Sequence, residues 1–246
     1  MKKLLSPEEI AHFHEQGFVC IPQITTAEEV AWLREAYDRL FERRAGWDKG
    51  DMFDFAGTDA PGVALAAPQL SFPSRYEPAL EKTIFRANAS AMAKQLLGAS
   101  AQLVFEHAML KPARTGAPTP WHQDEAFYAS KGGNDVITFW MALQPVDAHN
   151  GCMDFIAGSN QGPLLAHRRI NGDPRIHGLE AWAWTKAGVF HAPCPPAARR
   201  CTATTRCTTP MRTAPARLRA AVRRTPGQTP VRRTFSLEPG RGDRTA

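Results

Sequence analysis

Long apolar runs are missing from this chain of 246 residues, and cysteine is scarce. No uninterrupted apolar stretch approaches the roughly 20 residues that a membrane-spanning helix needs. The N-terminal stretch MKKLLSPEEI is basic but lacks the apolar region of a signal peptide. We therefore expect a cytoplasmic protein without a membrane contact. The five cysteines have no paired spacing, which argues against a disulfide framework.

The C-terminal segment 191–246 lacks lysine, isoleucine, tryptophan, tyrosine and asparagine altogether. It contains 12 Arg and only two acidic residues, Glu238 and Asp243, for a net charge of +10, whereas residues 1–190 carry −4. A segment without apolar periodicity cannot bury a core, so we expect it to be disordered. The sequence thus predicts a folded domain over 1–190 and a basic tail over 191–246.

Helix and strand patterns follow one another along residues 1–190. The stretch SPEEI (6–10) has the pattern of a helix start, and Gly17 is placed to end that helix. A second helix is expected from Thr26 to Gly46 and a third over about 78–97. Short strands are expected at 18–24, 101–110, 135–146 and 152–159. Helices followed by serial strands predict a mainly β fold, a sandwich or a barrel, with an N-terminal helical layer.

The stretch TPWHQD (119–124) contains a candidate metal site. On a strand, side chains at i and i+2 point to the same face, so His122 and Asp124 would lie together and Gln123 would point away. Two histidines and one carboxylate form the facial triad that holds Fe(II), and a His-x-Asp pair supplies two of these three ligands. The alternative interpretation is a surface pair at a strand end, without a metal.

Three stretches, which follow one another in the same order as in the phytanoyl-CoA dioxygenase family, make the chain resemble that family over roughly residues 5–190. LSPEEIAHFHEQGFVCIPQITTAEEVAWLREAYDRL resembles the opening elements of the family. PTPWHQDEAFY resembles its iron-binding strand, and FWMALQPVDAHNGCMDFIAGSNQGPLLAHR resembles the segment that follows. The resemblance implies a double-stranded β-helix, which is a jelly roll of the cupin-like kind. It also implies a dioxygenase that uses Fe(II), 2-oxoglutarate and O2 to hydroxylate a small organic or acyl substrate.

The resemblance also implies roles for particular residues. His122 and Asp124 match the first two iron ligands, and no further catalytic side chain is implied. Met109 and Trp140 match positions that line the 2-oxoglutarate pocket, although an apolar core position on a strand explains each equally well. Four further histidines match no ligand position: His107, His149, His167 and His177.

The family's second histidine ligand, and an arginine that pairs with 2-oxoglutarate, are missing downstream. After Val189 the sequence has only His191, which lacks the family context, so the barrel is expected to be incomplete at its C-terminal strands. Two interpretations are open: either the protein has lost this ligand, or the tail is the right DNA read in the wrong frame. The genetic code is consistent with the second. In this frame, the last base of each codon is read together with the first two bases of the following codon. The junction Cys207–Thr208 then encodes only His or Tyr, and the junction Arg219–Ala220 permits Arg. We therefore hypothesise a frameshift near residues 188–193.

Two other functions are consistent with the sequence. The basic tail would allow binding to nucleic acid or another acidic surface. Its only aromatic residue is Phe235, however, and base stacking needs aromatic side chains, so we do not expect nucleic acid as a partner. If the frameshift is real in the organism, the chain is a non-catalytic remnant of a dioxygenase.

Overall fold

The computed structural model describes residues 4–113, 117–128, 136–146 and 153–181, together with the backbone of three later strands. The α-helices are α1 (Pro7–Gln16), α2 (Ala27–Glu42) and α3 (Ile84–Leu97). The strands are β1 (Phe18–Ile21), β2 (Met52–Asp54), β3 (Pro68–Ser71), β4 (Gln102–Met109), β5 (Val136–Ala142), β6 (Met153–Ile156), β7 (His167–Arg169), β8 (Leu179–Ala181), β9 (Val189–Ala192), β10 (Arg200–Thr204) and β11 (Arg217–Arg223). The predicted mainly β composition with N-terminal helices is confirmed.

Local capping signals set the ends of the helices. Ser6 caps α1 and forms a capping box with Glu9, and Gly17 ends the helix in the left-handed conformation (φ 85°), as the sequence predicts. The third helix begins later than predicted. Thr83 caps α3, whereas the preceding residues Pro78–Lys82 form a separate 3-10 helix, so the predicted start near residue 78 is wrong.

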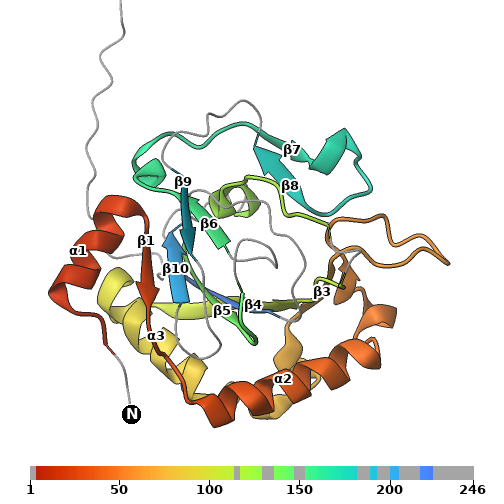
Figure 1. Ribbon diagram of the computed structural model, residues 1–246, viewed down its shortest axis with the longest axis horizontal. Helices are drawn as coiled ribbons and strands as arrows, with labels where there is room; N and C mark the ends of the chain where they lie inside the picture. The colour runs from red at the N-terminus through yellow and green to blue at the C-terminus, as the bar shows by residue number, and fades with distance from the viewer. Residues whose placement is uncertain are drawn as a thin grey trace, which may run out of the picture.

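Seven strands form one antiparallel sheet in the order β1-β10-β5-β11-β4-β3-β2. Strands β6 and β9 form a second sheet, and β7 and β8 a third. In Figure 1 helices α2 and α3 lie on one side of the large sheet, and the two small sheets lie on the other. The site described below is on the side of the small sheets.

Three of the strands come from the C-terminal part of the chain. Strands β10 and β11 occupy interior places in the large sheet, so the predicted incompleteness of the C-terminal strands is not confirmed. Both strands fall within 191–246, the segment that the sequence predicts to be disordered. Most of that segment lies outside the described residues, where the prediction stays untested.

Strand β5 is buried on both faces and separates two cores. Ile137, Phe139 and Met141 pack with the helices in the larger apolar cluster. Trp140 and Ala142 alternate with them and pack on the opposite face with β1 and β6. This alternation assigns each residue of β5 to the helical side or to the site side.

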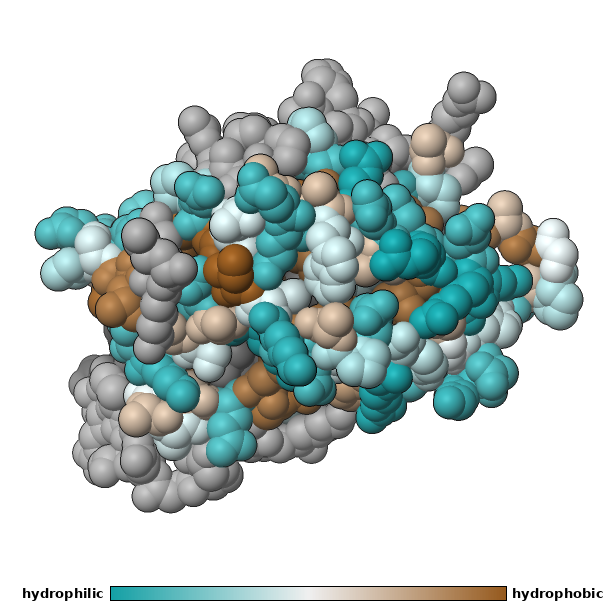
Figure 2. Space-filling view, turned by 90° about the horizontal axis from the view of Figure 1, so that it is seen from below, coloured by the Kyte–Doolittle hydropathy of each residue, from teal (hydrophilic) through white to brown (hydrophobic). Residues whose placement is uncertain are grey.

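The outer side of the helical layer is exposed to solvent. Seen from the side of α2, the surface is a mixture of hydrophilic areas and small, separate hydrophobic ones (Figure 2). In the described part of the chain, no helix combines the length and the apolar character needed to cross a membrane.

Candidate functional site

His122 and Asp124 come together as the sequence predicts, although not on a regular strand. Asp124 begins the 3-10 helix η4 (Asp124–Phe127), and Gln123 before it is extended, with φ −107° and ψ 126°. One extended residue is enough to send both neighbouring side chains to the same side. His122 Nε2 lies 3.2 Å from Asp124 Oδ1, and His122 is only 1% exposed.

Neighbouring groups orient both side chains. The Nδ1 atom of His122 lies 2.8 Å from the carbonyl oxygen of Pro120. A carbonyl can only accept, so Nδ1 donates, and in the neutral ring Nε2 presents its lone pair to Asp124. Thr138 Oγ1, on the site side of β5, donates to Asp124 Oδ2 at 2.9 Å. Two acceptor atoms at this distance need a proton or a cation beside them, and an imidazole nitrogen with a carboxylate oxygen suits Fe(II).

A third protein ligand is not found among the residues that the structure describes. No group of three or more His, Cys, Asp or Glu side chains there is arranged to hold a metal ion. The residues for which a shifted frame gives His or Tyr, Cys207–Thr208, lie outside the described residues. The position of the third ligand therefore stays a prediction.

Met109 lies in an apolar cluster that reaches the ligand pair. It ends β4 and packs with Phe55, Ala67, Ile170 and Ile176. Phe127 is packed against the same cluster, and its ring meets that of His122 edge-on, with the centroids 5.9 Å apart. The cluster therefore covers one side of the candidate metal site with apolar surface.

Trp140 is buried on the same side of the large sheet but in another cluster. It packs with residues that include Phe18, Met153 and Phe155, and the rings of Phe18 and Phe155 stack with centroids 4.8 Å apart. Met109 and Trp140 thus both face the site side from different strands. Their predicted place around 2-oxoglutarate stays a prediction.

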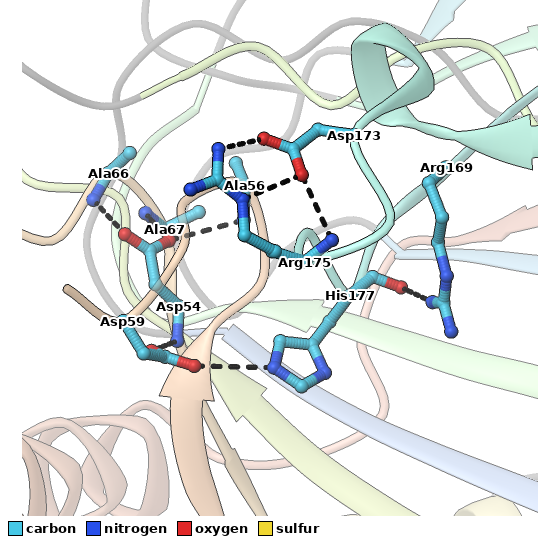
Figure 3. Close-up of polar contacts among 9 residues, drawn as sticks. All are labelled: Asp54, Ala56, Asp59, Ala66, Ala67, Arg169, Asp173, Arg175 and His177. Atoms are coloured by element: carbon cyan, nitrogen blue, oxygen red, sulfur yellow. Dashed lines mark hydrogen bonds and ion pairs between the residues drawn. The ribbon is translucent and has the colours of Figure 1, made fainter.

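Figure 3 shows the polar contacts within and between two segments, the loop after β2 and residues 169–177. The Asp54 carboxylate accepts hydrogen bonds from the backbone N–H groups of Ala56, Ala66 and Ala67, which closes the loop between β2 and β3. Asp59, within that loop, meets His177 Nε2 at 3.2 Å. These contacts join the loop that carries Phe55 to the segment that carries Ile176.

Arg175 and Arg169 order the second of these segments. The guanidinium of Arg175 binds both carboxylate oxygens of Asp173, at 2.9 and 2.6 Å, and lowers the pKa of that carboxyl to about 2. Arg169 donates to the carbonyl oxygen of His177 at 2.5 Å (Figure 3). The segment is thus fixed both along its own length and to the loop after β2.

A buried lysine supports the segment that leads to His122. Lys111 is 1% exposed, and its Nζ atom donates to the carbonyl oxygen of Ala117 at 2.6 Å and to Thr119 Oγ1 at 2.7 Å. The backbone N–H of Ala181 in β8 donates to the carbonyl oxygen of Trp121 at 2.7 Å. The chain before the ligand pair is therefore held from both sides.

His167 lies close to the ligand pair, although the sequence assigns it no ligand position. Its Nε2 atom accepts a hydrogen bond from the backbone N–H of Gln123 at 2.9 Å. Burial lowers its pKa most, the Leu165 carbonyl raises it, and the nearby His122 lowers it further. No local pattern reveals this contact, because 44 positions separate the partners. His107 is buried on β4.

A comparison with known protein families identifies the chain. Residues 13–196 match the family described as phytanoyl-CoA dioxygenase (PhyH). The chain belongs to the phytanoyl-CoA dioxygenase family. This confirms the resemblance found in the sequence, and it includes the His122–Asp124 pair.

Relatives within and around the phytanoyl-CoA dioxygenase family are distant in sequence. A probable alpha-ketoglutarate-dependent hypophosphite dioxygenase of Stutzerimonas stutzeri is 24% identical over 181 residues, covering 73% of this chain and 62% of the relative. The peroxisomal phytanoyl-CoA dioxygenase of Rattus norvegicus is 22% identical over 183 residues, covering 67% of this chain and 50% of the relative. The chain thus spans one half to three fifths of the length of these curated relatives.

Solved structures also resemble this family member. EvdO2 from Micromonospora carbonacea var. aurantiaca, complexed with 2-oxoglutarate, superposes with a TM-score of 0.72 at 28% identity, covering 90% of this chain and 91% of EvdO2. EctD from S. alaskensis with bound Fe superposes with a TM-score of 0.69 at 16% identity, covering 89% of this chain and 77% of EctD, which shows a likeness of fold. The overall fold is thus the cupin-like fold of these oxygenases.

Proposed function

We propose that this protein is an Fe(II)- and 2-oxoglutarate-dependent dioxygenase that uses O2 to hydroxylate a small organic or acyl substrate. The observation that carries the proposal is the meeting of His122 Nε2 and Asp124 Oδ1 at 3.2 Å in a buried setting. Family membership supports it, as does the likeness to EvdO2, whose structure holds 2-oxoglutarate.

His122 and Asp124 would hold Fe(II) through Nε2 and Oδ1. Bound there, Fe(II) supplies the activation of O2 that oxidation of a C–H bond requires. The carbonyl of Pro120 keeps the proton of His122 on Nδ1, so that Nε2 stays available for the metal. Thr138 holds the carboxylate of Asp124 in place from Oδ2. Ligands that are oriented in this way bind a metal more tightly than free ones.

The apolar groups around the pair keep water away from it. The ring of Phe127 lies perpendicular to that of His122, and Met109 lies in the same cluster as Phe127. We propose that Met109 and Trp140, on the site side of β4 and β5, line the position of 2-oxoglutarate. A dry, shaped site is what the protein contributes to such chemistry.

The third ligand and the arginine would come from the segment around β10 and β11. Strand β11 lies between β4 and β5, and backbone position 219 is in register with His107 and Trp140 on the site side. In a shifted frame the codons at 219–220 permit Arg, and those at 207–208, which precede β11, give His or Tyr. The family match ends at residue 196, close to the proposed shift at 188–193.

We therefore propose that residues 1–190 form most of a double-stranded β-helix and that 191–246 is read out of frame. The chain as written would then lack the distal His and Arg and bind iron weakly. The basic tail is explained by the shift, so binding of acidic partners has no separate support from the described residues.

The test compares the chain as written with one in which the frame is restored by the insertion of one base within codons 188–193. Release of succinate is measured with Fe(II) and 2-oxoglutarate, and His122→Ala in the restored chain is the control. We expect turnover only in the restored chain with His122 present. Turnover by the chain as written would contradict the frameshift hypothesis. An inactive restored chain would contradict the assignment of dioxygenase activity.

A further inference from the structure

Gln123, between the two candidate ligands, forms hydrogen bonds through both ends of its side-chain amide and through its backbone N–H. Its side chain is 3% exposed and points away from the ligand pair. Oε1 accepts from the backbone N–H of Leu165 at 2.6 Å, and Nε2 donates to the carbonyl oxygen of Pro163 at 3.1 Å. Its own backbone N–H donates to His167 Nε2 at 2.9 Å. One residue is thus fixed by three bonds to a segment about 40 positions away in sequence.

His167 has a single protonation pattern that satisfies its contacts. Its Nδ1 atom lies 2.8 Å from the carbonyl oxygen of Leu165, which can only accept, so Nδ1 carries the hydrogen. Its Nε2 atom is then an acceptor, as the Gln123 N–H requires. The imidazole is therefore a fixed acceptor that is itself held by the segment to which Gln123 binds.

We propose that Gln123 and His167 are positioning residues that hold His122 and Asp124 in the geometry for metal binding. We name this arrangement the ligand clamp: Gln123, His167 and the backbone of Pro163 and Leu165. The inference rests on the proposed function, because it assigns the clamp a role in holding the metal ligands.

The reason lies in the backbone of Gln123. Side chains at i and i+2 share a side only while the residue between them is extended, and Gln123 has φ −107° and ψ 126°. Rotation about these bonds would turn Asp124 away from His122. Residue 123 itself belongs to no strand: His122 before it forms an isolated β-bridge, and η4 begins directly after it at Asp124. The clamp therefore does for Gln123 what strand pairing does elsewhere.

The first readout is independent of metal and of activity. In the metal-free full chain, hydrogen exchange of the residue 123 amide and its HN–Hα coupling report the bond to His167 and the angle φ. For His167→Leu we expect exchange to be faster by about five- to tenfold, the effect of losing one hydrogen bond, with a changed coupling. His167→Gln keeps an acceptor near the Nε2 position and should restore both values.

The second readout is the binding of Co(II) to the full chain, followed by its visible spectrum. Gln123→Met and His167→Leu should weaken Co(II) binding by about tenfold or more, as loss of an outer contact does at other metal sites, and alter the spectrum. The matched control is Gln161→Met, because Gln161 Nε2 also donates to a backbone carbonyl, but to that of Glu15 in α1 and not to a ligand or a clamp residue. His167→Gln should bind Co(II) like the unchanged chain.

The outcomes separate the clamp from the function. Exchange, coupling and Co(II) affinity that are the same in His167→Leu as in Gln161→Met would overturn the clamp. If no variant and not even the unchanged chain binds Co(II), the metal function of this chain fails, while exchange and coupling still decide the clamp. If Gln123→Met does not fold, the comparison of His167→Leu with His167→Gln is sufficient for the test.

Discussion

The two faces of β5 are held by different kinds of contact. On the helical side, Ile137, Phe139 and Met141 contribute only apolar surface to a core shared with α2 and α3. On the site side, Thr138 donates a hydrogen bond to Asp124, and Trp140 packs with β6. One strand thus takes part in an apolar core, whose stability depends on the volume of the side chains, and in a polar site, whose geometry depends on the direction of hydrogen bonds.

This difference predicts how each side responds to substitution. Apolar burial is non-directional, so the helical side should lose stability in proportion to the volume removed. Hydrogen bonds are directional, and a buried polar group that loses its partner retains the cost of desolvation. Substitutions on the site side should therefore affect metal binding more than their effect on stability suggests.

The largest loss of stability is expected on the helical side. Leu33 of α2 is fully buried, and Leu33→Ala should lower the free energy of unfolding by about 2–5 kcal/mol. Leu4, which is 52% exposed, gives the matched control, since Leu4→Ala should change it by no more than about 0.5 kcal/mol. Urea unfolding followed by circular dichroism measures both. Equal effects would show that the helical core is not the main source of stability.

The next largest loss of stability is expected for substitution of Lys111, which lies on the site side. Lys111→Met keeps the length of the side chain but leaves the oxygens of Ala117 and Thr119 without this donor. We expect a loss of about 1–3 kcal/mol in urea unfolding, together with weaker Co(II) binding. Lys94→Met, at an exposed position near the end of α3, should change neither quantity. Unchanged Co(II) binding in Lys111→Met would limit this lysine to a structural role.

Substitutions on the two faces of β5 test the comparison directly. Thr138→Val removes the bond to Asp124 Oδ2 with little change of shape, and should weaken Co(II) binding by about tenfold. Ile137→Val on the helical side should cost about 0.5–1.5 kcal/mol of stability and leave Co(II) binding unchanged. If both substitutions weaken Co(II) binding equally, the two faces are not functionally separate.

The parts of the fold that the sequence predicts are those with local causes. The capping box of Ser6 and Glu9 and the left-handed Gly17 define α1 within a dozen residues. The sequence does not predict the short strands β2 and β3, because three or four residues give too little periodicity to distinguish a strand from a loop. The predicted start of the third helix near residue 78 coincides with the start of the separate 3-10 helix Pro78–Lys82, whereas α3 itself begins at Ile84.

The candidate site likewise contains contacts that local sequence predicts and contacts that it does not. His122 and Asp124 are two positions apart, so a spacing rule finds them. Thr138 is 14 positions from Asp124, and His167 is 44 from Gln123. Partners at such distances are chosen by the packing of the whole domain, and no spacing rule marks them. The sequence accordingly predicts that Gln123 points away from the metal, but not what it binds there.

The smallest effect that we expect is a dependence of stability on pH through His167. Burial holds its pKa below the ordinary 6.5, so below pH 6.5 the unfolded chain binds a proton more readily than the folded one. Stability should therefore fall as the pH drops through 6.5, until the pH reaches the lowered pKa of the folded state. His167→Gln cannot titrate and should lose this part of the slope. Urea midpoints of both proteins above and below pH 6.5 isolate the difference, because the other seven histidines are common to both. Parallel slopes would mean that the proton on His167 does not oppose folding, and that its Nε2 is not held as an acceptor by Gln123.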